Sequence, residues 1–411
     1  MPPVRLLVLA AYPESVASTR LRACGYFSLL QGAGITAELH PFLDDAAARV
    51  LYTRGRTPDK ALGVLHGAMR RLVILCRSRR YDAVFVQREA CLIGPPWVEQ
   101  ILVQGLRVPL IFDFDDALWL ASHERSRNPR MARLLRFPAK TRTLLRIASQ
   151  VIAGSTYLAE YAGRLNARTT VLRTVVSREA WRPLPGRLSG AWASRDGIPT
   201  IGWVGSHSTA HQLELVIPAL TALAQRGHRF RVRLVGADRC ITVPGIEVTS
   251  VPWTLEREVQ DFREADIAVT PMFDDEWSQG KCGLKQLQYM AVGVPLVGSA
   301  QGGAREFLEH EGNALVAEDA PSTTVALERL LGDKPLRARL ATVGRNLVES
   351  RLCTEAQGPA LAAIIRDVAS TGARRRPPGA APGAERDDSL HPFEHPAPMC
   401  GRGPDVRRPP T

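Results

Sequence analysis

Residues 277–298 read WSQGKCGLKQLQYMAVGVPLVG. The glycine-containing loop that ends at Gly280 predicts a helix over Cys282–Val292, and the apolar run after it predicts a strand over Pro295–Ser299. A loop, a helix and a short buried strand in this order are typical of an open parallel sheet. The stretch therefore predicts an α/β fold.

The same alternation continues through the chain in both directions. Short apolar runs predict strands, and each is followed by a segment with helical periodicity. The predicted strands are 4–10, 36–39, 83–87, 110–114, 151–153, 200–204, 231–235, 267–270 and 295–299. The predicted helices include 18–31, 59–79, 211–226, 255–264 and 282–292, with three more between 321 and 370. This order predicts parallel sheets with helices on both faces.

One segment interrupts the alternation. Residues 181–199 are rich in proline and glycine, which predicts an interdomain linker. We expect two Rossmann-like domains, 1–180 for an acceptor and 200–370 for a donor, facing each other across a deep cleft. Residues 371–411 are rich in proline, arginine and glycine and lack periodicity, so we expect a disordered tail.

The composition limits the classes of function that the protein can have. The chain has 411 residues, 45% hydrophobic content and a net charge of +12. The charge favours an anionic partner, but with 6% aromatic residues a nucleic acid is not expected. The seven cysteines have no Cys-x-x-Cys spacing, so we expect neither a zinc site nor a redox pair. The N-terminal apolar run lacks the flanks of a signal peptide, which predicts a cytoplasmic protein.

The start of the predicted helix at 282–292 suits a phosphate. Free amides at a helix N-terminus, here those of Gly283 and Leu284, attract anions. Lys281 and Lys285 are four residues apart and would share one helix face, while Gln288 could reach a ribose hydroxyl. The alternative is a solvated cationic helix start without a ligand.

Four further motifs carry weaker signals. Asp113-Phe114-Asp115-Asp116 resembles a metal-binding pattern but equally suits a helix cap, and we expect no metal. Arg20 and Arg22 lie early in a predicted helix, where cations are unfavourable, which indicates an anionic ligand unless they are ordinary surface residues. His207 could donate to a phosphate or be an ordinary loop residue. Residues 125–146 contain eight cations between leucines, which predicts either contact with anionic lipid or a solvated helix face.

The residues at 280–295 resemble the donor-site helix of the group 1 (family 4) glycosyltransferases, which have the GT-B fold. Similar stretches are 18–22, 81–89 and 113–119 in the first half and 201–206, 296–299 and 302–306 in the second. The resemblance implies transfer of a sugar from a nucleotide sugar, with retention of configuration and without a metal or other cofactor.

These motifs, taken together with the resemblance, lead to a set of predicted site residues. We assign catalysis to Asp115, Asp116 and Lys281, with Asp115 or Asp116 orienting the acceptor hydroxyl. Acceptor binding is assigned to Arg20, Arg22 and Asp113. Donor binding is assigned to Gly205, Ser206, His207, Lys281, Gly283, Leu284, Lys285, Gln288 and Glu306. The acceptor is expected to be a glycan or a lipid-linked molecule, with peripheral contact to an anionic membrane.

The chain differs from the family at four positions. The family usually has two glutamates where this chain has Gly280 and Gln288, and it has an arginine and a lysine where this chain has Ser206 and about His211. Lys281 and Lys285 would supply the cations for the diphosphate from another direction. A second reading is a non-catalytic protein of the same fold that binds a nucleotide sugar or a glycan.

Overall fold

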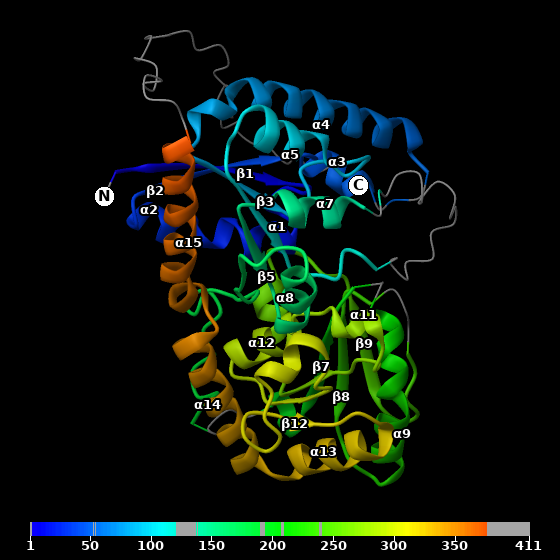
Figure 1. The fold of residues 1–411 in the computed structure, drawn as a ribbon. Coiled ribbons are helices and arrows are strands. Elements are labelled where there is room, and N and C mark those ends of the chain that lie inside the picture. Colours follow the sequence, from blue (N-terminus) through cyan, green and yellow to red (C-terminus); the bar gives the residue numbers. More distant parts are fainter. Residues whose placement is uncertain are drawn as a thin grey trace, which may run out of the picture. The chain divides into compact units, whose positions relative to one another are not determined.

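A computed structural model describes residues 2–51, 53, 55–120, 137, 139–189, 194–206, 209–237 and 241–375. The described residues belong to one compact unit, Met1–Arg376 (Figure 1). The tail predicted to be disordered lies outside the described residues except for its first five positions, which continue the last helix, α15. The predicted limits of the two domains and of the linker stay predictions.

The first half of the chain forms a six-stranded parallel sheet in the order β2-β1-β3-β4-β5-β6. Its strands are β1 (Val4–Ala10), β2 (Ile35–Pro41), β3 (Ala83–Gln87), β4 (Leu110–Phe114), β5 (Gln150–Ala153) and β6 (Thr169–Val171). Its α-helices are α1 (Ala17–Arg22), α2 (Phe27–Gly32), α3 (Asp45–Leu51), α4 (Thr57–Arg77), α5 (Trp97–Gln100), α7 (Lys140–Ile147) and α8 (Thr156–Gly163).

The second half forms another six-stranded parallel sheet, in the order β12-β11-β10-β7-β8-β9. Its strands are β7 (Thr200–Val204), β8 (Arg231–Val235), β9 (Glu247–Val251), β10 (Ile267–Thr270), β11 (Leu296–Gly298) and β12 (Leu315–Val316). Its α-helices are α9 (Ile217–Gln225), α10 (Glu258–Arg263), α11 (Glu276–Gln279), α12 (Leu284–Ala291), α13 (Ala320–Gly332), α14 (Lys334–Arg351) and α15 (Thr354–Arg375). Short 3-10 or π turns lie at 24–26, 78–80, 101–105, 195–197, 210–215 and 302–306.

The predicted architecture of two parallel sheets is confirmed, with two corrections to the helices. The helix expected over 18–31 is divided into α1 and α2 by a 3-10 turn at Cys24–Tyr26. The helix expected over 211–226 is a 3-10 turn followed by α9, which has Pro218 in its first turn. Proline lacks the amide hydrogen that an α-helix would need there, so the α-helix begins at this point.

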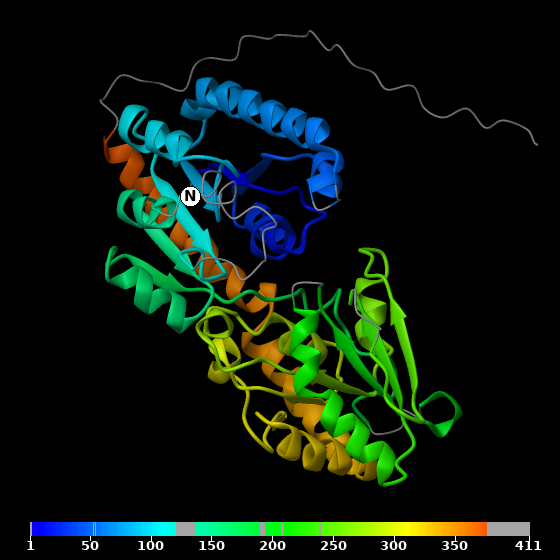
Figure 2. The same cartoon turned by 90° about the vertical axis from the view of Figure 1, so that its right-hand side faces the viewer.

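The last helix returns to the first sheet. In Figures 1 and 2 the orange α15 lies beside the blue and cyan elements of the first half. Leu361 and Ile365 of α15 share a buried apolar cluster with Leu6 of β1, and the same cluster includes Leu287 of α12 and Leu296 of β11. A single hydrophobic core therefore extends from the first sheet to the helix that precedes β11.

Arg345 of α14 holds the connection between the two halves. It is 4% exposed, and its guanidinium donates to the backbone carbonyls of Arg178 at 2.8 Å, Trp181 at 2.9 Å and Ala291 at 2.6 Å. Ala291 is the last residue of α12, where a cation also suits the helix dipole. The side chain thus joins the predicted linker to the C-terminal end of α12.

We expect Arg345→Met to lower the free energy of unfolding by about 3 kcal/mol, because buried carbonyls would lose their donors. The matched control is Arg351→Met on the same helix, where the side chain is exposed and the change should be within about 0.5 kcal/mol. Denaturant unfolding of both variants measures the difference. Equal midpoints for the two variants would contradict this role of Arg345.

Candidate active site

The N-terminus of α12 lacks a side-chain cap. Gly283 precedes the helix with a φ of 74°, and no side chain accepts from the first amides. No acidic residue lies in the first turn. A Cβ at Gly283 would lie 2.9 Å from the backbone of Ala304, so only glycine suits both the conformation and the space. The amides of this turn therefore remain available to an anion.

Lys285 places a partly buried cation in that first turn. Its ammonium donates to Oε1 of Gln288 at 3.2 Å and lies 5.2 Å from the centre of the Phe262 ring. Burial lowers the pKa of Lys285 to about 8, with Glu258 opposing the shift and Arg20 adding to it. Among the described residues no carboxylate forms an ion pair with Lys285, so the charge is desolvated without a direct counterion.

Gln288 is fully buried behind Lys285. Its Oε1 accepts from the lysine, and its Nε2 has no partner among the described residues. The structure therefore places this amide where it positions Lys285. Contact between Gln288 and a ribose hydroxyl stays a prediction.

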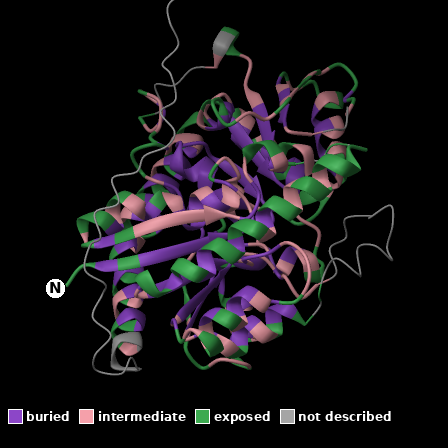
Figure 3. Cartoon of the chain, turned by 90° about the horizontal axis from the view of Figure 1, so that it is seen from above, coloured by how far each residue is buried: buried purple, intermediate pink, exposed green. Residues whose placement is uncertain are grey.

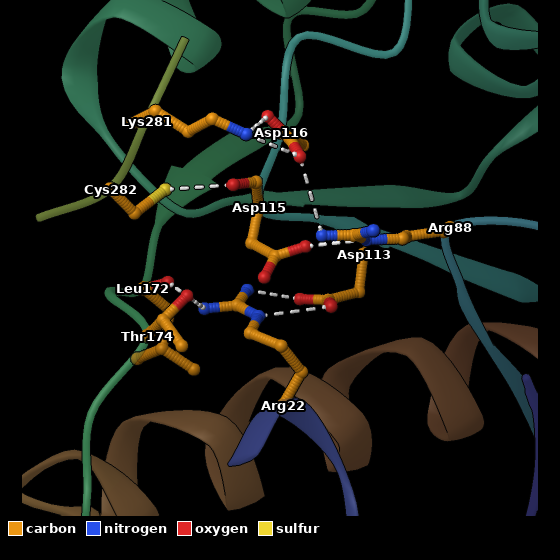
Figure 4. Close-up of polar contacts among 9 residues, drawn as sticks. All are labelled: Arg22, Arg88, Asp113, Asp115, Asp116, Leu172, Thr174, Lys281 and Cys282. Carbon is orange, nitrogen blue, oxygen red and sulfur yellow. Dashed lines mark hydrogen bonds and ion pairs between the residues drawn. The ribbon is translucent and has the colours of Figure 1, made fainter. Parts of the chain in front are cut away.

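Lys281 lies before α12, so the interpretation that it shares a helix face with Lys285 is wrong. The helix begins at Leu284, and the left-handed Gly283 separates the two lysines. The ammonium of Lys281 is 3.0 and 3.1 Å from the two carboxylate oxygens of Asp116 (Figure 4). It also lies 4.0 Å from the centre of the Trp277 ring. Two residues that we assigned to different substrates thus form one ion pair.

The carboxylates at the end of β4 are each paired with a cation (Figure 4). Asp113 forms a two-pronged ion pair with Arg22, and the two residues are 1% and 3% exposed. Asp115 accepts from Arg88 at 2.8 Å, and Asp116 lies 3.6 Å from the same guanidinium. Burial would raise the pKa of Asp115, but the charges of Arg88 and Arg22 outweigh it and lower the pKa. Asp115 is therefore an ionised structural partner and a weak base.

Arg88 is a site residue that the sequence prediction missed. It follows β3 directly, and its φ of 63° is unusual for a residue with a side chain. Burial would lower its pKa, yet Asp115 and Asp116 raise it above the ordinary value. The stretch Tyr81–Glu89 is part of the family resemblance, but nothing in it indicates that Arg88 reaches Asp115 and Asp116, which are 27 and 28 positions later.

The carboxyl ends of the two sheets meet at small residues. A Cβ at Gly280 would lie 2.5 Å from Cβ of Ala117, and Sγ of Cys282 donates to the carbonyl of Asp115 at 3.1 Å. A Cβ at Gly154, after β5, would lie 2.5 Å from the same sulfur. The glutamate that the family has at position 280 would not fit this contact.

Two other predicted site residues also join the two halves. Glu306 accepts from the amide of Thr156 at 2.9 Å and from its hydroxyl at 2.6 Å, and it pairs with Arg173. Arg20 pairs with Glu258 of α10 at 2.6 Å. Arg22 donates to Asp113, to the carbonyl of Leu172 and to Thr174, so its donors are directed at the protein. Binding of a ligand by these residues stays a prediction.

The remaining predicted residues are placed as follows. Gly205 and Ser206 form the turn after β7, where the Ser206 amide donates to the hydroxyl of Thr209 at 3.0 Å. His207 lies outside the described residues, as do the cations of 125–146 except Lys140, Arg142 and Arg146. Lys140 is buried against Glu89 at 2.8 Å, so it is not available to lipid. Within the described ranges no group of three ligating side chains could hold a metal ion.

A pocket opens at the carboxyl edge of the second sheet. Its lining includes Val216, Pro271, Ser299, Glu318 and Thr323. Val216 precedes α9, Pro271, Ser299 and Glu318 follow β10, β11 and β12, and Thr323 lies in the first turn of α13. The pocket therefore lies at the sheet edge where open α/β sheets bind ligands. The sequence prediction did not identify it, because its residues come from separate segments.

Comparison with known proteins agrees with this geometry. Residues 198–333 match the family described as Glycosyl transferases group 1. Comparison with curated protein sequences gave no match. Among solved structures, Anabaena HepE in complex with UDP-glucose has a TM-score of 0.60 at 16% identity, covering 90% of this chain and 100% of HepE.

Two further structures are similar over comparable lengths. Sucrose-phosphate synthase from Thermosynechococcus elongatus has a TM-score of 0.62 at 16% identity, covering 90% of this chain and 100% of the synthase. A glycosyltransferase from Rickettsia africae has a TM-score of 0.61 at 12% identity, covering 89% and 98% of the two chains. At such low identity these similarities establish the fold.

The two parallel sheets and their joined carboxyl edges define a protein of the GT-B fold. Residues 198–333, which include α12 and both lysines, match the group 1 glycosyltransferase family. The family resemblance and the enzyme class predicted from the sequence, a glycosyltransferase, are thereby confirmed.

The lowered pKa of Lys285 predicts unusual reactivity. Because this amine loses its proton near pH 8, its rate of acetylation should level off above about pH 8. Competitive acetylation followed by mass spectrometry measures it, with the exposed Lys334 as the control in the same sample. A rate for Lys285 that still rises in parallel with that of Lys334 above about pH 9 would contradict the prediction.

Proposed function

We propose that this protein transfers a sugar from a nucleoside diphosphate sugar to a hydroxyl of a glycan or lipid-linked acceptor, with retention of configuration and without a metal. The observation that carries the proposal is Lys285, a partly buried cation with no ion-paired carboxylate in the described part of the chain, beside the uncapped start of α12. A diphosphate would supply the missing negative charge and accept from the free amides.

The chemistry requires stabilisation of the leaving group. As the bond to the sugar breaks, negative charge builds on the β-phosphate, and fixed donors lower the barrier most when they face that charge. Lys285, Lys281 and the amides of Gly283 and Leu284 are the donors we assign to this charge. A retained configuration does not depend on a dedicated general base, which agrees with the lowered pKa of Asp115.

The nucleoside is assigned to the carboxyl edge of the second sheet, where open α/β sheets bind their ligands. HepE binds UDP-glucose on the same fold, which supports a uridine nucleotide as the first donor to test.

Asp116 and Lys281 would exchange partners during the reaction. In the structure their charges neutralise each other, and both side chains are about a quarter exposed. A diphosphate would compete with Asp116 for Lys281. Once released, the Asp116 carboxylate could accept a hydrogen bond from the acceptor hydroxyl and orient it. We infer a cytoplasmic site of action, where nucleotide sugars are available.

Thermal shift with UDP, GDP, dTDP and ADP and with their sugars identifies the nucleotide, because a ligand that binds only the native state raises the melting temperature. Release of nucleoside diphosphate that depends on an added acceptor then separates a transferase from a protein that only binds the donor. We expect both a stabilising nucleotide and acceptor-dependent release. Binding without release under all acceptors would support the non-catalytic reading.

We expect Lys281→Ala to lower kcat about a hundredfold or more, near the loss of one transition-state donor. Steady-state release of nucleoside diphosphate from the donor found above measures the change. Lys334→Ala, which removes an exposed lysine of α14, is the control and should leave kcat unchanged. An unaltered kcat for Lys281→Ala would remove this residue from the proposal.

Asp116→Asn tests the exchange of partners. Without the competing carboxylate, Lys281 should hold the diphosphate more firmly, and UDP should bind about fivefold more tightly by calorimetry. At saturating donor, turnover should fall, because the acceptor hydroxyl loses its carboxylate. Asp59→Asn, which removes an exposed carboxylate paired with Arg56, is the control. Unchanged UDP affinity would show that the diphosphate does not compete for Lys281.

A further inference from the structure

Helix α4 carries large apolar residues on its outer face. Leu62, Leu65, Met69, Leu72 and Val73 are 51%, 58%, 54%, 48% and 50% exposed. Only six other large apolar residues among the described ones are exposed to a comparable degree, and they are scattered over the chain. In Figure 3, which views the unit from above, α4 crosses the near face, and most of its ribbon has the colour of exposed residues.

The five residues form one stripe. Their spacings of three, four, three and one place them on the same side of a helix that turns once every 3.6 residues. The opposite side faces the core, since Arg71, Ile74 and Leu75 are buried. An amphipathic helix on a sheet needs only that inner apolar face. The outer stripe, defined here as these five residues, lies outside the buried apolar cluster that packs on the first sheet.

Basic residues border the outer stripe. Arg70 and Arg77 are exposed, seven residues apart and therefore on one side of the helix, and Arg79 and Arg80 follow its end. Between Lys60 and Arg80 the sequence has no aspartate or glutamate. The carboxylates at this surface are Asp59 in the first turn of α4, which pairs with Arg56, and Asp44, which pairs with Arg70 at the rim. The surface is thus apolar along its centre and cationic at its border.

We propose that the outer stripe of α4 inserts into the headgroup region of an anionic lipid membrane, with the exposed Arg77 and Arg80 on lipid phosphates. Apolar side chains beside a basic border are what a helix lying in the plane of a bilayer requires. A second copy of this chain would fit less well, because a symmetric contact through the same face brings the two basic borders together.

This surface differs from the basic stretch at 125–146, to which the sequence had assigned membrane contact. Each helix of a parallel sheet runs back from the carboxyl edge of one strand to the start of the next. The N-terminal end of α4, which carries Leu62, is therefore the end on the side of Asp115 and Asp116. Membrane contact there would bring the proposed site close to a lipid-linked acceptor.

Vesicle sedimentation tests the proposal with the full chain and without any donor or acceptor, so its outcome is independent of catalysis. Wild type should sediment with vesicles of phosphatidylcholine and phosphatidylglycerol and far less with phosphatidylcholine alone. Leu65→Ser/Met69→Ser should lower the bound fraction about tenfold or more, and Arg77→Gln/Arg80→Gln should make the remaining binding insensitive to lipid charge.

The matched control is Val325→Ser/Val343→Ser, which removes two residues of α13 and α14 that are 55% and 40% exposed. It should bind vesicles like the wild type. All variants should melt at the wild-type temperature, because every altered side chain is exposed. The proposal is overturned if Leu65→Ser/Met69→Ser binds vesicles like the wild type or if lipid charge has no effect on wild type. It is also overturned if the wild type is a dimer that this variant dissociates.

Discussion

The pairing of charges at the end of β4 is the constraint on which the site depends. Three aspartates within four residues would repel one another at a sheet edge, and burying them unpaired would be costly. Arg22 and Arg88 reach Asp113 and Asp115 from the segments after β1 and β3, and Lys281 reaches Asp116 from the second sheet. Removing one member would leave a charge without its partner in a partly desolvated place.

The same pairing explains why the two sheets approach so closely there. An ion pair between Lys281 and Asp116 draws residues 280–282 onto 115–117, and the small residues Gly280, Cys282 and Ala117 allow the close approach. Glu306 with Thr156, and Arg20 with Glu258, add polar contacts on either side. Polar contacts of this kind are individually modest, so the apolar core shared by the two halves contributes more to holding them together.

Apolar runs predicted the central strands well because a parallel sheet covered on both faces leaves little room for other residues. The strands β3, β4, β7, β8 and β10 have the predicted limits. The missed strands β6, β9 and β12 lie at or near the sheet edges, where β9 is largely exposed and β12 has two residues. These three strands were not predicted from their own sequences. They form because a neighbouring strand of the sheet offers backbone hydrogen bonds to them.

The sequence predicted most residues of the site, but it did not predict which of them contact one another. The segment 277–298 indicated Lys281 and Lys285, but not that Gly283 is left-handed and separates them. Likewise, Asp113 and Arg22 were both identified, yet only the fold shows that they satisfy each other. Ion pairs between residues far apart in the sequence leave no local pattern, so Arg88 was not predicted at all.

The contacts described above give one explanation for two departures from the family, Gly280 and Gln288. A glutamate at 288, three residues after Lys285 and within hydrogen-bonding reach, would neutralise that ammonium and raise its pKa. Gln288 keeps the hydrogen bond without the charge, and Gly280 places no carboxylate beside Lys281. The chain therefore exchanges two negatively charged residues for two neutral ones around the start of α12. That exchange leaves Lys281 and Lys285 without a carboxylate at positions 280 and 288, which strengthens the attraction of this region for a diphosphate.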